Sequence, residues 1–512
     1  MVSRLKFVAA LLGVALGAML HANSLKVKVE QGKLQGKFVN EGRVRAFLGI
    51  PYAAPPLEAL RWRAPAPAAH WKGVRQARRY GAHCEQFPFP DMIFPDADMS
   101  EDCLFLNVFT PAHAKNSSKL PVMFWIHGGA YFAGSASEPR HDGDFLPAKG
   151  VVLVTINYRL GVFGFLDTDE LIAEGDGSAG NYGLMDMIAA LRWVKANIAQ
   201  FGGDPQKVTI FGESAGSFAV STLMASPMAK GLFIRAIGES GSALGGGLGG
   251  QAAAKAAPAE TAWVREALGV KSLAELRAMP AEAILAATRK HGAPAFAPVV
   301  DGKVLTEPVA ATYAEGKQAH IPLLDGWNRD EGSFSAPKEM TAEKWKAAAE
   351  KRFGDQAAAF LKAYPGADDA EAERASIDYA GDMFIAFGTW KWIEAQSKTG
   401  EAPVYRYHFE LAAPPSKFHD ATAYHSDEIE YVFGTLATRP GAEWRPEDRK
   451  LSEEMMSYWT NFAKTGDPNG PGLPAWPRFD KTGEVMHLDR DSQATPDTTR
   501  ARYEFLLKTA KR

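Results

Sequence analysis

Residues 208–216 read VTIFGESAG, an apolar, β-branched run that leads into the pattern Gly-x-Ser-x-Gly. A run rich in Val, Ile and Phe predicts a buried strand. Glycines two positions before and after Ser214 suit a sharp turn from strand to helix, because larger side chains would clash there. The segment therefore predicts a nucleophile elbow, a turn that presents a serine hydroxyl for attack. A serine in an ordinary glycine-rich turn is the alternative.

A second serine stands in a similar sequence. Residues 238–241 read GESG, which lacks a glycine at the second position after Ser240. We therefore expect Ser240 to lie near the site without being the nucleophile.

Other segments of the chain also predict strands and helices. Runs at 122–127, 151–158 and 321–327 also predict buried strands, and apolar residues recur at helical spacing over 184–198. Strands that alternate with helices favour an α/β fold, with parallel pairing and a sheet covered on both faces. The Gly- and Ala-rich stretch at 245–257 predicts a loop inserted within one domain, because strand-like runs resume after it.

A serine nucleophile needs backbone N–H donors aimed at the negative charge that develops on the substrate oxygen. Residues 125–130 read WIHGGA, so a predicted strand ends in consecutive small residues, as a loop that approaches a substrate closely would require. We expect the N–H groups of Gly129, Ala130 and Ala215 to form this oxyanion hole. A plain tight turn is the alternative for the glycines.

The bulk composition excludes some classes of protein. The 512 residues are 46% hydrophobic and 23% charged, which predicts a globular chain with a sizeable core. The formal net charge of −3 is too small to attract nucleic acid or an anionic membrane surface. We expect neither as a partner.

The N-terminus has the order of a secretory signal. Arg4 and Lys6 precede an apolar run at 7–20, and the small residue Ala22 follows at a plausible cleavage point. The run is shorter than the roughly 20 apolar residues needed to cross a bilayer. We therefore expect residues 1–22 to be a signal peptide, and the mature chain to be exported to the periplasm or secreted without a membrane span. An uncleaved membrane anchor is the alternative.

The chain has two cysteines, Cys84 and Cys103. In an oxidising compartment this pair predicts one disulfide, and two buried free thiols are the alternative. Two cysteines without nearby paired histidines do not make a zinc set. We expect neither a metal nor a cofactor.

Three further segments carry a family resemblance. They are FLGIPYAAPP at 47–56, SEDCLFLNV at 100–108 and FGGDP at 201–205, which leads into the elbow. With these segments the chain resembles type-B carboxylesterases, the family that includes cholinesterases and bacterial para-nitrobenzyl esterases, over nearly all of residues 23–512. The resemblance implies one α/β-hydrolase domain, with a central, mostly parallel sheet covered by helices on both faces. It also implies hydrolysis of small carboxylic esters through an acyl-enzyme intermediate.

The resemblance also implies the partners of Ser214 in a Ser-Glu-His triad. The segment GWNRDEG at 326–332 places the acid at Glu331, and HSDEIEYVFG at 425–434 places the base at His425. In such a triad the imidazole takes the serine proton, while the carboxylate fixes its tautomer and stabilises the imidazolium. Nearby rivals exist for two of the roles, namely Asp330 and His419.

Two departures from the family bear on the substrate. Position 130 is alanine where many relatives have glycine, which keeps the N–H but adds a methyl group. The segment between the cysteines contains no Trp, whereas cholinesterases carry their choline-stacking Trp there. Phe87, Phe89 and Phe94 offer only a weak cation–π face or serve as loop anchors. A quaternary ammonium substrate is therefore disfavoured.

Other functions remain open on these residues. Some proteins that resemble this family bind partners without catalysis, as adhesion modules, although those usually lack the nucleophile. A lipase or an amidase would use the same site. The acyl and alcohol specificity, the natural substrate and the oligomeric state do not follow from the sequence, because pocket shape comes from scattered loops.

Overall fold

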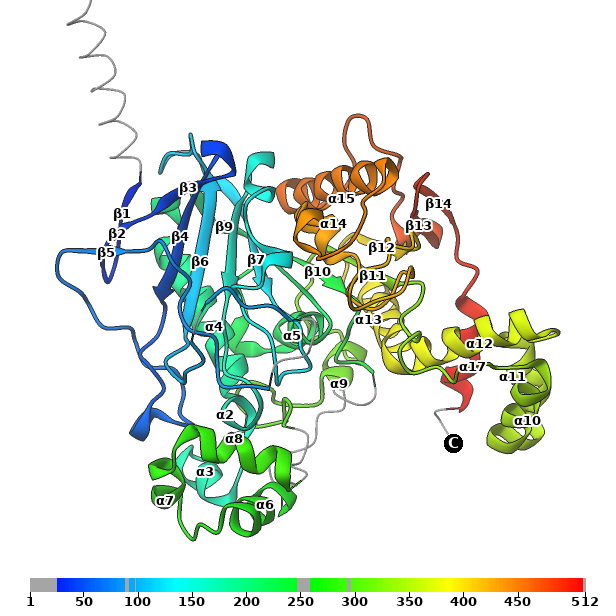
Figure 1. Ribbon diagram of the computed structural model, residues 1–512, viewed down its shortest axis with the longest axis horizontal. Coiled ribbons are helices and arrows are strands. Elements are labelled where there is room, and N and C mark those ends of the chain that lie inside the picture. Colours follow the sequence, from blue (N-terminus) through cyan, green and yellow to red (C-terminus); the bar gives the residue numbers. More distant parts are fainter. Residues whose placement is uncertain (1–24, 88–91, 97, 246–257, 292–295, 510–512) are drawn as a thin grey trace, which may run out of the picture.

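The computed structural model describes residues 25–87, 92–96, 98–245, 258–291 and 296–509, and an 11-stranded sheet runs through the molecule (Figure 1). The strand order is β14-β13-β12-β11-β10-β9-β7-β8-β6-β4-β3. The strands of this sheet are β3 (Lys37–Val39), β4 (Val44–Pro51), β6 (Phe105–Pro111), β7 (Leu120–Ile126), β8 (Val152–Ile156), β9 (Gly203–Glu213), β10 (Arg235–Glu239), β11 (Leu323–Asn328), β12 (Val404–Phe409), β13 (Glu484–Leu488) and β14 (Gln493–Pro496). A small second sheet contains β1 (Lys26–Val29), β2 (Gly32–Gln35) and β5 (Val74–Gln76).

The centre of the large sheet is parallel. Every neighbouring pair from β13 through β8 in the strand order is parallel, whereas the pairs at both edges are antiparallel. The four runs expected as strands correspond to β7, β8, β9 and β11, with ends that differ by a few residues. The predicted mostly parallel sheet is confirmed.

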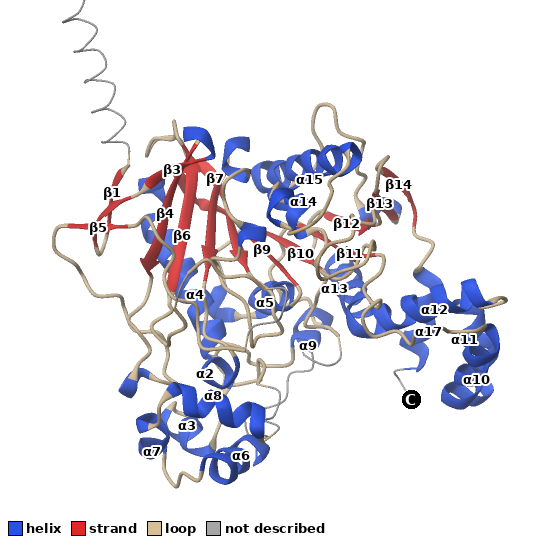
Figure 2. Ribbon diagram, in the orientation of Figure 1, coloured by secondary structure: helices blue, strands red, loops and turns tan. Residues whose placement is uncertain are grey.

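Helices cover both faces of the sheet (Figure 2). The α-helices are α2 (Gly161–Phe165), α3 (Asp169–Glu174), α4 (Tyr182–Asn197), α5 (Ala215–Ala225), α6 (Pro258–Leu268), α7 (Leu273–Ala278), α8 (Ala281–Lys290), α9 (Val309–Ala314), α10 (Ala342–Phe353), α11 (Ala357–Ala363), α12 (Asp369–Gly381), α13 (Phe387–Thr399), α14 (Ile429–Phe433), α15 (Pro446–Thr465), α16 (Phe479–Thr482) and α17 (Arg500–Thr509). The helix expected at 184–198 is α4.

Strand β7 shows why the sheet needs both layers. Successive side chains of a strand point to opposite faces. Phe124 packs in the core cluster that also contains side chains of α4 and α5, whereas Met123 and Trp125 pack in a second cluster with α14 and α15. Because both faces of the strand are apolar, each face must be covered, and the predicted two-sided α/β architecture is confirmed.

Two of the expectations fall partly or wholly outside the described residues. Residues 1–22, expected as a signal peptide, lie outside them, as do residues 246–257 of the predicted loop. The strand after that loop, β11, pairs with β10 in the same sheet. None of the helices within the described ranges is long and apolar enough to cross a membrane.

The cysteines are joined as expected. Cys84 and Cys103 form a disulfide, so the alternative of two free thiols is wrong. Phe87 and Phe94 lie in the loop that this disulfide closes. The Arg289 guanidinium lies 5.5 Å from the centroid of the Phe87 ring, and the Phe94 ring packs on the His83 ring. These two phenylalanines anchor the loop, and Phe89 lies outside the described residues.

Candidate active site

The segment around Ser214 is a sharp turn between β9 and α5. Ser214 has φ 52° and ψ −122°, and its N–H donates to the Glu239 carbonyl at 2.8 Å. A Cβ on Gly212 would lie 2.5 Å from the carbonyl oxygen of Ile126, and a Cβ on Gly216 only 2.0 Å from it. Both glycines are therefore required because the turn is pressed against the end of β7, as the elbow pattern predicts.

The structure brings Ser214, His425 and Glu331 together. His425 lies between the other two, with Nε2 2.9 Å from Ser214 Oγ and Nδ1 2.7 Å from Glu331 Oε2. The second oxygen of Glu331 accepts the N–H of Asn328 at 2.9 Å. Ser214 follows β9 and Glu331 follows β11, two parallel strands whose carboxyl ends meet at one edge of the sheet, where ligands bind in open α/β folds.

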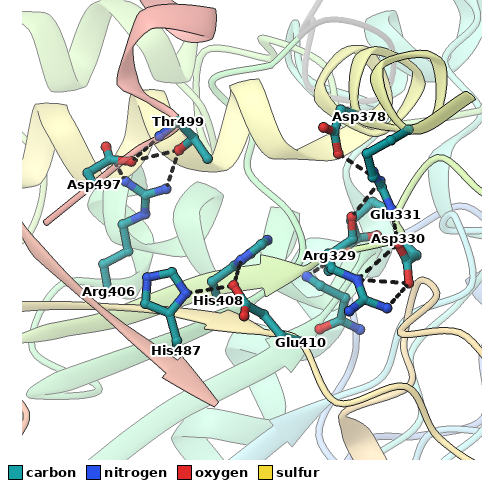
Figure 3. A network of polar contacts seen from close by, with 12 residues as sticks. Arg329, Asp330, Glu331, Asp378, Arg406, His408, Glu410, His487, Asp497 and Thr499 are labelled. Carbon is teal, nitrogen blue, oxygen red and sulfur yellow. Dashed lines mark hydrogen bonds and ion pairs between the residues drawn. The ribbon is translucent and has the colours of Figure 1, made fainter. Parts of the chain in front are cut away.

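Asp330, the rival acid, faces away from His425. Its carboxylate forms ion pairs with Arg329 and Arg374 and accepts the N–H of Ala423 at 2.9 Å. Figure 3 shows the Asp330 carboxylate directed at the Arg329 guanidinium. Asp330 therefore holds neighbouring segments in place.

The two other alternative residues, His419 and Ser240, are not part of the group formed by Ser214, His425 and Glu331. His419 stacks on Tyr424 with ring centroids 3.8 Å apart, and it lines the pocket above Ser214. Ser240 is fully buried after β10, where its N–H donates to the Gly326 carbonyl at 2.9 Å. Its position near the elbow, without contact to His425 among the described bonds, agrees with the expectation.

Backbone N–H groups are available beside the serine. Gly129 and Ala130 both have left-handed backbone, with φ 104° and 52°. Within the described part of the chain, no hydrogen bond uses either N–H group. Ala215 is the first residue of α5, where N–H groups lack partners within the helix. The loop and the helix end thus offer three unpaired donors next to Ser214.

Glu213 is a polar group of the site that sequence reasoning missed. It is buried, and its Oε1 lies 3.3 Å from His425 Nε2. Burial raises the pKa of Glu213 to about 7, and the nearby His425 only partly opposes this. The sequence did contain a signal for Glu213, namely a carboxylate at the end of an otherwise apolar strand. A buried charge needs a partner, so such a residue is expected to face another polar group.

His425 has a shifted pKa for identifiable reasons. Burial lowers the pKa, but the carboxylates of Glu213 and Glu331 outweigh burial and raise it to about 9. Arg140 supports the same segment, since it donates to the Ser426 carbonyl at 2.7 Å and pairs with Glu430 at 3.3 Å. The imidazole is therefore held in place and made more basic.

A pocket of about 610 Å³ opens above Ser214. Its apolar lining includes Met92, Phe334, Phe384, Phe418 and Ile429. The Phe384 ring lies edge to face with the His425 ring, with centroids 4.9 Å apart. These residues come from loops, a π-helix (Asp382–Ala386) and the first residue of α14, which are far apart in the chain, so no local pattern could have placed them together.

A serine on a strand-to-helix elbow, an imidazole within hydrogen-bonding distance and a carboxylate behind it are the arrangement of α/β-hydrolase-fold serine hydrolases. The sheet order and the helices on both faces agree with that class. The class alone does not identify the substrate.

Comparison with known proteins identifies the family. The model of the carboxylesterase family matches residues 23–506. The chain is 37% identical over 471 residues to fumonisin B1 esterase of Sphingopyxis macrogoltabida. This alignment covers 87% of this chain and 83% of that protein. The chain is also 37% identical to human cocaine esterase, in an alignment that covers 88% of this chain and 85% of that protein. A solved PNB esterase structure superimposes with a TM-score of 0.79 at 35% identity, covering 94% of this chain and 98% of that chain.

The chain therefore belongs to the carboxylesterase family, and it is a carboxylic ester hydrolase. The family membership that the sequence motifs indicated is confirmed. The alternative of a binding module without catalysis is not favoured.

Proposed function

We propose that Ser214 is the nucleophile, His425 the general base and Glu331 the acid of this hydrolase. The supporting observation is that the His425 imidazole reaches Ser214 Oγ with one nitrogen and Glu331 with the other. Ser214 Oγ attacks the ester carbonyl carbon and passes its proton to His425 Nε2. The imidazolium then gives the proton to the leaving alcohol, which leaves an acyl group on Ser214.

Water completes the cycle by the same route. His425 removes a proton from a water molecule, the resulting oxygen nucleophile attacks the acyl carbon, and Ser214 regains its proton as the carboxylic acid departs. The N–H groups of Gly129, Ala130 and Ala215 hold the oxyanion in both halves. They act most strongly when negative charge develops, because their positions are fixed before the reaction.

The substrate that suits this pocket is a small, neutral ester with an apolar group. The disulfide loop contains no Trp, unlike the corresponding loop of cholinesterases. A quaternary ammonium ion would therefore lack a cation–π contact that stabilises binding by about 0.5–2 kcal/mol. Phe87 and Phe94 of that loop do not line the pocket. We expect 3,3-dimethylbutyl acetate to be hydrolysed with a kcat/KM at least equal to that of acetylcholine, its charged analogue of the same shape.

Steady-state kinetics on that pair tests the proposed substrate class. Short and long acyl esters and a matched amide complete the panel and separate an esterase from a lipase or an amidase. A tenfold preference for the choline ester would contradict a pocket selective for neutral groups, and efficient turnover of the amide alone would contradict the proposed ester specificity.

The acid limb of the pH profile should lie above the usual titration of histidine. His425 acts as a base only when neutral, so activity is low below its pKa and rises as the pH passes it. Because Glu213 and Glu331 stabilise the imidazolium, we expect the midpoint between the ordinary 6.5 and about 9. Glu213→Gln removes one carboxylate and should move the midpoint downward.

The measurement is kcat/KM on a short acyl ester against pH, after subtraction of spontaneous hydrolysis. Asp420→Asn is the matched control, because it removes an exposed carboxylate from the pocket rim, where solvent screens its charge. It should leave the midpoint nearly unchanged. A flat profile across this range would argue against a histidine base.

We also propose that the enzyme is exported, with residues 23–512 as its mature hydrolase domain. The N-terminus has charged, then apolar, then small residues, which is the order of a secretory signal. The Cys84–Cys103 disulfide also supports export, since disulfides persist in oxidising compartments. Protein recovered from the periplasm or the medium should lack Met1 to about Ala22 by intact-mass analysis. A cytosolic protein that retains Met1 would contradict export.

A further inference from the structure

Three side chains of types that can ligate metal ions converge at the carboxyl ends of β12 and β13. They are His408, Glu410 and His487, and one ligand atom of each lies within 4.8 Å of the others. Glu410 Oε1 lies 2.7 Å from His408 Nδ1 and 2.6 Å from His487 Nδ1. Figure 3 shows both imidazoles directed at this carboxylate.

The sheet register places these side chains together. His408 and His487 are direct partners in the parallel pairing of β12 with β13, so their side chains lie on the same face of the sheet. Their strand neighbours Tyr407 and Met486 point to the opposite face, into the core. Glu410 follows the end of β12, and its N–H donates to the Leu488 carbonyl at 2.9 Å. The geometry therefore belongs to the strands rather than to a mobile loop.

The donor set fits one class of ion. Two imidazoles and one carboxylate are the protein ligands of zinc sites that keep a further position for water. Imidazole nitrogen suits zinc-like transition metals, whereas Mg²⁺ and Ca²⁺ prefer oxygen. The three side chains are between 13% and 25% exposed, so solvent can supply the remaining ligand. The buried Nε2 of His487 has no hydrogen-bond partner among the described residues.

The surrounding charges leave room for a cation. Arg406 lies on the same face of β12, but its guanidinium pairs with Asp497 at 2.6 Å and donates to Thr499 at 3.0 Å. Figure 3 shows the Arg406 guanidinium directed at Asp497 and Thr499. It also lies over the Trp327 ring, 4.3 Å from the centroid. Arg406 is thus neutralised by its own partners, and Arg329, whose charge also interacts with Glu410, is paired with Asp330 at 2.8 Å.

We propose that His408, Glu410 and His487 form a binding site for a divalent transition-metal ion of the zinc class. The linear sequence offers no metal motif, because the two histidines are far apart in the chain. None of the three residues lines the pocket above Ser214. The site is tied to the triad segment through the backbone, since Arg329 N–H donates to the Phe409 carbonyl at 2.9 Å, between two of the ligands.

Zinc binding by tag-free protein stripped with chelator and dialysed tests the proposal without reference to ester hydrolysis. Calorimetric titration with ZnCl2 should show one saturable site per chain, and the Tm should rise with zinc. His408→Ala and His487→Ala should each weaken binding by about 100-fold or more, because loss of even an outer partner of a metal ligand costs about 10–100-fold. His320→Ala is the control, since this exposed histidine contacts only the Gly316 carbonyl among the described bonds.

Two further measurements keep the test decisive. If an alanine variant fails to fold by circular dichroism, Glu410→Gln serves instead, because it keeps the shape and removes the charge. Co²⁺ bound to the wild type should give a visible absorption band that zinc abolishes. Absence of saturable zinc binding in the wild type would overturn the proposal, as would unchanged affinity in the folded variants.

Discussion

Ser214→Ala and His425→Ala should each lower kcat by several powers of ten in a protein that remains folded. Each removes a group that takes part directly in bond formation, so only the oxyanion hole and substrate binding would still contribute. Glu331→Gln should cost less than either, because it removes the orientation and charge stabilisation of the imidazole rather than the nucleophile or base. Steady-state kinetics on a short acyl ester measures all three.

Asp330→Asn and His419→Ala are the matched controls. Asn at position 330 keeps an acceptor for the Ala423 N–H but weakens the pairs with Arg329 and Arg374, so stability can fall while kcat per folded enzyme stays close to the wild type. His419→Ala changes the pocket wall and should act on KM more than on kcat. If either control reduced kcat more than its rival in a folded protein, the assignment of Glu331 or His425 would be wrong.

Gly216→Ala should prevent folding or destabilise the protein by about 3 kcal/mol or more, at the upper end of the cost of overpacking. The added Cβ would lie 2.0 Å from the carbonyl oxygen of Ile126 and 3.1 Å from that of His127. Both are backbone atoms at the end of β7, so no side-chain rotation can relieve the overlap. Helix α5 would have to move away from the sheet and carry Ser214 with it.

Chemical unfolding and soluble yield measure this effect, with Gly231→Ala as the control. Gly231 has φ 78° and open space where the methyl group of an alanine would lie, so alanine there should cost only the left-handed backbone penalty of about 1–2 kcal/mol. A Gly216→Ala protein with the stability and kcat of the wild type would show that the elbow does not need its close contact with β7.

Local sequence determined the elbow and the buried central strands near it. VTIFGESAG contains both the strand and the glycines that its tight approach requires, and these are short-range properties of the chain. Buried strands also show locally, because parallel strands covered on both faces are continuously apolar. The family motifs added His425 and Glu331, which spacing alone does not single out from His419 and Asp330.

Only the tertiary structure decided which polar groups face each other. Glu331 reaches His425 while Asp330 turns to two arginines, and Glu213 approaches the imidazole from the strand end beside Ser214. The pocket wall and the cluster around Glu410 likewise join residues from distant segments. Such groupings depend on strand order and register, which arise from packing between elements far apart in the chain, so no local pattern specifies them.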